Sequence, residues 1–286
     1  MGLTDSVPAT LLTKATTYNF STEEKARREG ALLNKDFYYG RQEKSLNLVN
    51  LDVDPITVNH THSIIRKKTD LLYSRPILRD FIGNAKSVNF LNNVYPLMNM
   101  DQFMQKVDLS AELTGTALVF VGIDDDGVPF FRLYDASEFS AVANPDVNNS
   151  TPDAISLISV FTEVQDNKVP QIAPQVAMNM RTETWMNDHV VVHVNGKQVS
   201  VIANDLGYLP FVEFKGEEVY NQYLGHAPAS HIRMLNSYIN QMHTNLGYMI
   251  KMQSATPIIL EGFQNGEGVV VHPGKAISLP AGGDAR

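Results

Sequence analysis

Residues 229–254 read ASHIRMLNSYINQMHTNLGYMIKMQS. In this stretch an apolar side chain recurs at alternating steps of three and four residues, at Ile232, Leu235, Ile239, Met242, Leu246 and Met249. Because side chains three and four positions apart share one face of an α-helix, this heptad-like spacing predicts one long helix with an apolar seam. At 1.5 Å per residue the helix would be roughly 40 Å long.

The other faces of this helix carry uncharged polar side chains, and no aspartate or glutamate occurs from His226 to Leu260. A core position would explain the apolar seam. It would not explain the uncharged polar side chains on the other faces, because lone surface helices usually carry Glu–Lys pairs there. Packing against identical neighbours, or facing a pore, would explain them. For the first explanation the seam is the candidate oligomerisation surface. For the second, the candidates for facing a channel are Asn236, Asn240, Thr244 and Lys251.

The composition is that of a folded protein without disulfides. The chain has 286 residues, a net charge of −8, 43% hydrophobic residues and no cysteine. The absence of cysteine excludes a disulfide scaffold and a thiol nucleophile. The acidic balance argues against a conventional duplex-DNA-binding protein, which gathers Lys and Arg on one face. The most apolar runs, 117–123 and 190–194, are too short to span a bilayer, so we expect no membrane association.

The sequence before the long helix predicts helices followed by antiparallel strands. Ser21 and Asn59 are candidate N-caps for helices over 23–35 and 60–75, and a third helix fits 100–113, where Gly115 stops it. Hairpins are expected around an Asp-Gly turn (116–123 with 128–134) and an Asn-Gly turn (188–194 with 197–202). Further strands are expected over 154–164, 179–186 and 209–214. The fold class predicted is therefore α+β, with a short β element after Pro257.

The sequence contains no recognisable catalytic motif. His60 and His62 could chelate a metal only with a third ligand, and their place at a helix start favours capping or surface roles. Carboxylates for acid–base work would have to come from Glu112, Asp135, Glu138 or Glu183, which the sequence does not bring together. We expect no catalytic residue, no metal and no cofactor.

The order of the predicted helices, strands and short motifs along the chain resembles that of the portal protein of tailed bacteriophages, over about Arg27 to Ile277. The segments that carry the resemblance are Tyr38-Tyr39-Gly40, Ile64-Ile65, 71–76 (LLYSRP), 113–117 (LTGTA) with the Asp-Gly hairpin, 134–138 (YDASE), 209–214 (LPFVEF), Gly225 and the helix end 255–257 (ATP).

The resemblance implies a structural, non-enzymatic subunit of a ring of about twelve copies at one capsid vertex. Double-stranded DNA would pass through the ring, which would dock the terminase packaging motor and the neck, adaptor and capsid proteins. The protein would belong to the virion, after assembly in the host cytoplasm.

The resemblance also implies a division of the chain. We expect a loose N-terminal arm (1–20), an α+β wing (21–225), a stem helix (226–255) and a partial clip (256–286) that includes Val269, Val270, Val271 and Ile277. We expect the second stem helix and the crown of the family to be lacking. The alternatives are another self-assembling virion component, such as an adaptor or capsid-associated protein, or a soluble α+β enzyme.

Overall fold

The computed structural model describes residues 21–43, 46, 54–75, 77–124, 126–143, 152–165, 175–220, 222–254, 260–261 and 284–285. The expected N-terminal arm and the four clip residues Val269, Val270, Val271 and Ile277 lie outside the described residues. The described chain is α+β, as predicted. Its helices are α2 (Thr22–Tyr38), α3 (His60–Leu72), α4 (Ala85–Leu97), α5 (Met100–Thr114) and the long α6 (Pro228–Ser254).

Strands β1 to β8 lie between α5 and α6, two short strands follow α6, and the strands described pair antiparallel in every sheet. A three-stranded sheet has the order β2-β1-β8 and consists of β1 (Thr116–Ile123), β2 (Pro129–Asp135) and β8 (Phe211–Lys215). A five-stranded sheet has the order β3-β4-β5-β6-β7, from β3 (Phe139–Ala143), β4 (Pro152–Gln165), β5 (Gln175–Trp185), β6 (His189–Val194) and β7 (Lys197–Ala203). The short strands β9 (Leu260–Glu261) and β10 (Asp284–Ala285) pair with each other.

Most of these elements lie where the sequence predicts them, because short-range interactions define their ends. The Ser21 hydroxyl accepts a hydrogen bond from the Glu24 amide at 3.2 Å, and the Asn59 side chain accepts one from the His62 amide at 2.9 Å. These are the two helix N-caps expected. The Asn-Gly turn joins β6 to β7 with both Asn195 and Gly196 at positive φ, as a type I′ turn requires.

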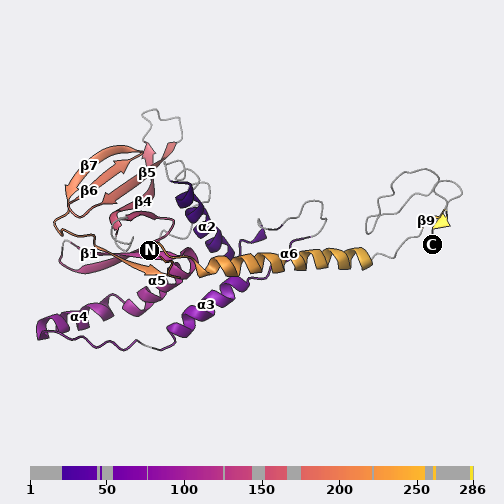
Figure 1. Cartoon of the computed structure of the whole chain (residues 1–286), viewed down its shortest axis with the longest axis horizontal. Helices are drawn as coiled ribbons and strands as arrows, with labels where there is room; N and C mark the ends of the chain where they lie inside the picture. Colours follow the sequence, from indigo (N-terminus) through magenta and orange to yellow (C-terminus); the bar gives the residue numbers. More distant parts are fainter. Residues whose placement is uncertain are drawn as a thin grey trace.

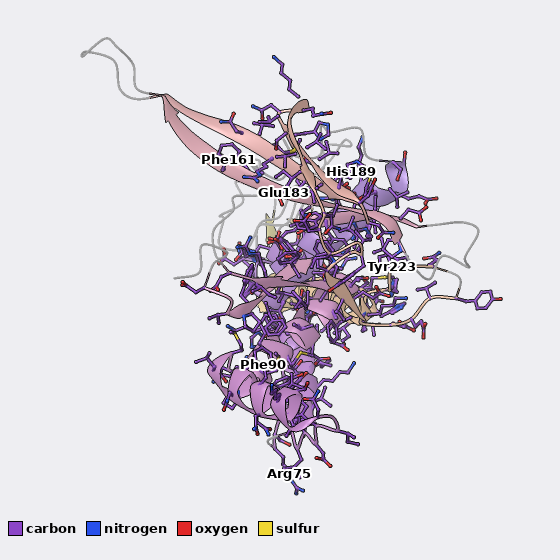
Figure 2. All side chains as sticks on the ribbon, turned by 90° about the vertical axis from the view of Figure 1, so that its left-hand side faces the viewer. Arg75, Phe90, Phe161, Glu183, His189 and Tyr223 are labelled. Atoms are coloured by element: carbon purple, nitrogen blue, oxygen red, sulfur yellow. The ribbon has the colours of Figure 1, made fainter. Side chains whose placement is uncertain are left out.

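Two elements, α4 and β3, were not predicted. Along α4, Val94 is buried, and Val88, Leu91 and Tyr95 recur at helical spacing and are half-buried. The Asn84 side chain caps the helix by accepting from the Ser87 amide at 2.8 Å. Pro96 in the last turn weakens this helical signal in the sequence. Strand β3 is short and pairs only with β4. Figure 2 shows Phe90 of α4 and Arg75 at the opposite end of the molecule from Phe161 and Glu183 of the five-stranded sheet.

Apolar packing joins the layers. Helix α5 packs on the three-stranded sheet through the buried cluster Val107, Ala111, Ala117 and Val119. The two larger sheets meet through three aromatic rings. The Phe120 ring centroid lies 5.3 Å from those of both Trp185 and Phe211. Because such ring pairs add to simple area burial, this cluster holds the strands together as one body. Figure 1 shows α6 running away from that body.

A backbone crossing of three glycines sets the start of α6. A Cβ atom on Gly115 would lie 2.7 Å from the Gly225 carbonyl oxygen, and one on Gly216 would lie 2.4 Å from the Ala111 carbonyl oxygen. The Gly216 amide donates to the Gly115 carbonyl at 2.9 Å, and the Gly225 amide donates to the Thr116 hydroxyl at 2.8 Å. The end of α5, the exit from β8 and the entry to α6 therefore touch through their backbones.

We expect Gly115→Ala to destabilise the protein more than Gly127→Ala does. Both glycines have positive φ, 91° and 77°, which costs a side chain about 1–3 kcal/mol of strain. A Cβ on Gly127 meets nothing within 4 Å, whereas one on Gly115 meets the backbone of the α6 entry. Urea unfolding of the two variants measures the difference. Equal losses of unfolding free energy would show that the crossing is not close-packed.

Candidate functional site

Helix α6 buries a ladder of polar side chains, one every fourth residue. Asn236, Asn240 and Thr244 are at most 1% exposed. Their side-chain oxygens accept hydrogen bonds from the backbone amides of an extended segment before and into α3, at 2.8 Å from Thr61, 2.9 Å from Val58 and 3.0 Å from Ile56. The helix thus binds the segment 56–61 as a neighbouring strand would, through its main-chain donors.

The donors of the ladder are satisfied as well. The Asn236 amide donates to the Val58 carbonyl at 2.8 Å, and the Asn240 amide donates to the Gln42 side chain at 2.6 Å. Nearby, the buried Asn34 of α2 donates to the Leu113 carbonyl at 2.9 Å and to the Ser230 hydroxyl at 3.0 Å. Because buried polar groups stabilise only when their partners are present, this network fixes α6 in one position relative to α2, α3 and α5.

The expectation that Asn236, Asn240 and Thr244 face a channel is wrong. Each of them is buried inside its own subunit against the segment 56–61. The sequence showed an uncharged polar flank correctly, but it did not show that an extended segment of the same chain covers that flank. Lys251 is exposed, and its place in a channel stays a prediction.

The apolar seam of α6 is exposed instead. Exposed fractions run from 36% for Ile239 to 68% for Leu235, with Met242, Leu246 and Met249 at 53–55%. Ile232 differs, because it packs against the subunit's own cluster of Tyr38, Ile65, Leu113 and Ala229. At 3.6 residues per turn, the seam from Leu235 to Met249 lies roughly 140° around the helix from the polar ladder. The long helix therefore presents an uncovered apolar stripe in the subunit.

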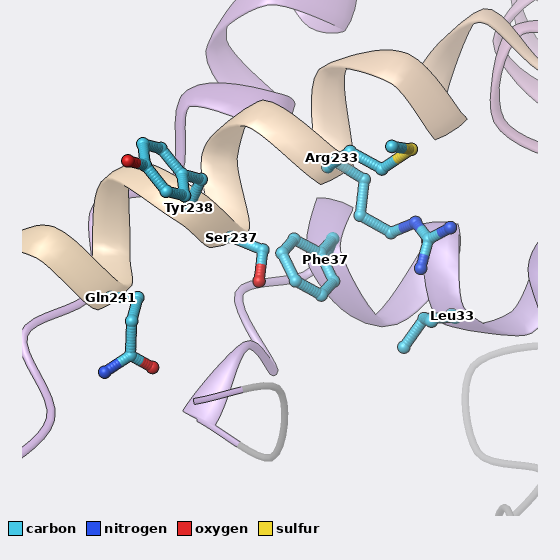
Figure 3. A pocket seen from close by; sticks show the side chains of 7 residues that line it. Leu33, Phe37, Arg233, Ser237, Tyr238 and Gln241 are labelled. Carbon is cyan, nitrogen blue, oxygen red and sulfur yellow. The ribbon is translucent and has the colours of Figure 1, made fainter. Parts of the chain in front are cut away.

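A third face of α6 forms a groove with α2. Its lining residues are Leu33, Phe37, Arg233, Met234, Ser237, Tyr238 and Gln241. Figure 3 shows Leu33 and Phe37 coming from α2 and the other labelled side chains from α6. Arg233 Nε is buried there with no hydrogen-bond partner among the described residues, and burial lowers the pKa of this guanidinium.

The candidate acid–base carboxylates have structural partners. Glu112 pairs with Lys68, and Glu183 pairs with Arg181 at 2.8 Å. Asp135 pairs with Lys35, and it also accepts a hydrogen bond from the Ser137 amide at 2.8 Å. Only Asp135 and Glu138 come together, in the turn between β2 and β3.

The environment of that turn shifts the pKa values of both carboxyl groups, in opposite directions. Burial, and next the charge of Asp135, raises the pKa of Glu138 to about 7. Burial alone would raise the pKa of Asp135, but the Lys35 ammonium and the Ser137 hydrogen bonds hold it below its ordinary value. Since Glu138 in turn accepts from the Asp135 amide at 3.0 Å, the pair shapes a turn and offers no open catalytic site.

We expect Glu138→Gln to flatten the pH dependence of stability between pH 4.5 and about 7. The folded state raises the pKa of Glu138 from 4.5, so it binds the proton more tightly than the unfolded chain does. Stability from this group is complete below pH 4.5 and is lost as pH rises, by at most about 1.4 kcal/mol per pH unit. Urea unfolding across this range measures the slope. An unchanged slope in the variant would refute the shift.

The histidines of the predicted pair do not form a metal site with a third ligand among the described residues. His62 lies against Tyr38, with ring centroids 4.5 Å apart, and His60 begins α3. A different trio, Glu217, His226 and His231, does converge. This trio is not visible in the sequence, because spacings of nine and five residues match no helix or strand, and only the turn into α6 brings the three side chains together.

The ladder can be tested at its middle. Asn240→Ala leaves the Val58 amide without its side-chain acceptor and removes one of the donors to the Gln42 side-chain oxygen, so we expect a loss of about 1–3 kcal/mol of unfolding free energy. The matched control is Asn245→Ala on the exposed side of α6, which should change it by less than about 0.5 kcal/mol. Hydrogen exchange should also speed up at Val58 in the first variant alone. Identical behaviour of the two variants would refute the ladder.

Among the described residues, none of the helices has the length and apolar character needed to cross a membrane. No curated protein sequence matches the chain. Residues 19–255, however, match the family described as "Phage portal protein, SPP1 Gp6-like". The matched range contains the helices, the two larger sheets and the whole of α6. The chain therefore belongs to the phage portal protein family.

Proposed function

We propose that copies of this chain pack side by side through α6 into a closed ring of about twelve subunits at one capsid vertex. The ring forms the entry and exit channel for double-stranded DNA. It docks the terminase packaging motor during assembly in the host cytoplasm, and it contacts the capsid and the neck or adaptor proteins. Residues 21–225 form the wing, residues 226–255 the stem helix and residues 256–286 part of the clip.

Membership of the phage portal family supports the general part of this proposal, which is a structural role in an oligomeric assembly. Phage portal proteins are structural components of the virion that assemble as oligomers, and their family is non-enzymatic. The paired carboxylates described above agree with a structural role, since each serves a turn or an ion pair of the fold.

The observation that carries the ring proposal is the uncovered seam of α6. Contiguous exposed apolar surface on a folded protein usually marks an interaction site. Here the large apolar side chains of the seam stand on the helix that runs away from the β-sheets (Figure 1). The polar ladder holds that helix rigidly, so the seam is already in place before a partner arrives.

The groove between α2 and α6 supports a head-to-tail arrangement. Ring closure by rotation requires two different, complementary surfaces on each subunit. The seam supplies one apolar surface, and the groove with Leu33, Phe37 and Tyr238 supplies a second on another face of the same helix. The lack of carboxylates from His226 to Leu260 avoids repulsion where identical helices approach.

The net charge of −8 suits passage of DNA through the ring. Tight duplex binding depends on Lys and Arg that neutralise phosphates. An acidic subunit offers few such contacts, so DNA can slide past it rather than stick.

We expect Leu235→Asp or Met242→Asp to block ring formation while the subunit stays folded. The two side chains are 68% and 55% exposed, so the substitution should change the unfolding free energy of the subunit by less than about 0.5 kcal/mol. In a ring, however, the new carboxylate would be buried against a neighbour without a partner, which is strongly unfavourable. Light scattering gives the mass of each variant, and circular dichroism checks its fold.

The matched control is Leu71→Asp, at a helical leucine of α3 with the same degree of exposure, 67%. This variant should assemble like the unchanged protein. Rings formed by the α6 variants, or rings lost equally in the control, would rule out α6 as the assembly surface.

A further inference from the structure

We propose that Glu217, His226 and His231 bind a divalent transition-metal ion, such as Zn²⁺, where the chain passes from the sheets into α6. One ligand atom from each side chain lies within 4.8 Å of the other two. All three side chains are exposed, so an ion can reach them from solvent. This proposal stands on the cluster itself and does not depend on ring formation.

The backbone beneath the site is fixed before any ion binds. Glu217 and His226 form an isolated antiparallel bridge, in which the Glu217 amide donates to the His226 carbonyl at 3.1 Å and the reverse bond is 2.9 Å long. Directly opposed residues of an antiparallel pair project their side chains to the same side. The adjacent glycines, Gly216 and Gly225, belong to the close-packed backbone crossing at Gly115. Two of the three ligands are therefore held by a rigid frame.

The third ligand comes from the first turn of α6. The His231 ring centroid lies 5.1 Å from that of His226, with the ring planes at 40°. His226 Nδ1 lies 3.8 Å from the nearer Glu217 carboxylate oxygen. Zinc–ligand bonds of about 2.0–2.2 Å in a tetrahedral site put the ligand atoms roughly 3.4 Å apart. Small side-chain rotations at the surface bring the three groups to that spacing.

The ligand set favours zinc over the hard cations. Two imidazole nitrogens suit Zn²⁺ and its transition-metal neighbours, whereas Mg²⁺ and Ca²⁺ prefer sites made of oxygen ligands. Two histidines and one glutamate leave a fourth position for water. An ion bound in this way would tie the strand exit to the first turn of α6, so it would fix the direction in which the helix leaves the sheets.

The test is a calorimetric titration of the full chain with ZnCl₂ after treatment with EDTA. We expect one Zn²⁺ per chain to bind at this site, with little change in excess Mg²⁺. His226→Ala and His231→Ala should each weaken binding by at least about 10–100-fold, because even residues that only support metal ligands cost that much. His243→Ala is the matched control, since His243 is an exposed histidine of α6 outside the cluster, and it should bind like the unchanged protein.

Thermal unfolding gives a second readout. Zn²⁺ should raise the melting temperature of the unchanged protein and of His243→Ala but not of the two ligand variants, because a bound ion stabilises only the folded state that holds it. The proposal is overturned if Zn²⁺ fails to bind, if both ligand variants bind it as the unchanged protein does, or if Mg²⁺ displaces it at similar concentration.

Discussion

The arrangement of the whole subunit depends on one close backbone contact, the crossing of Gly115, Gly216 and Gly225. At this point the end of α5, the exit from β8 and the entry to α6 approach more closely than any side chain would allow. The hydrogen bonds between Gly216 and Gly115, and between Gly225 and Thr116, lock the three segments together. The direction in which α6 leaves the sheets is therefore set by main-chain geometry, and both the polar ladder and the exposed seam follow from that direction.

Beyond the crossing, two faces of α6 differ in what they contact. The ladder of Asn236, Asn240 and Thr244 binds the helix to its own chain through directional hydrogen bonds, which fix position and register. The apolar seam is left uncovered, and apolar contacts are less directional and suit packing between copies. Polar bonds within the subunit and apolar contacts between subunits would let each copy fold completely before it assembles, which suits a structural component of a virion.

Many of the helices and turns could be predicted from the sequence, because interactions between residues close in sequence determine where they begin and end. The N-caps at Ser21 and Asn59, the end of α5 at Gly115 and the Asn195-Gly196 turn are short-range effects, and each was found where the sequence indicated. Helix α4 was not predicted although Val88, Leu91 and Tyr95 show helical spacing, and Pro96 inside the helix weakens that signal. The channel-facing assignment of Asn236, Asn240 and Thr244 failed for another reason. Their partners, 56–61, lie about 180 residues away in sequence, and an unpartnered polar face looks the same whether solvent, a pore or a strand covers it. Glu217, His226 and His231 converge only through the fold of the turn into α6.

The most direct measurement is the native mass of the purified, unmodified chain, obtained by native mass spectrometry with negative-stain images of the same sample. Packing of identical subunits through α6 predicts a closed ring of about twelve copies, with the helices around its axis. A protein that stays monomeric as its concentration is raised, with the seam of α6 still open to solvent, would contradict assembly through this helix.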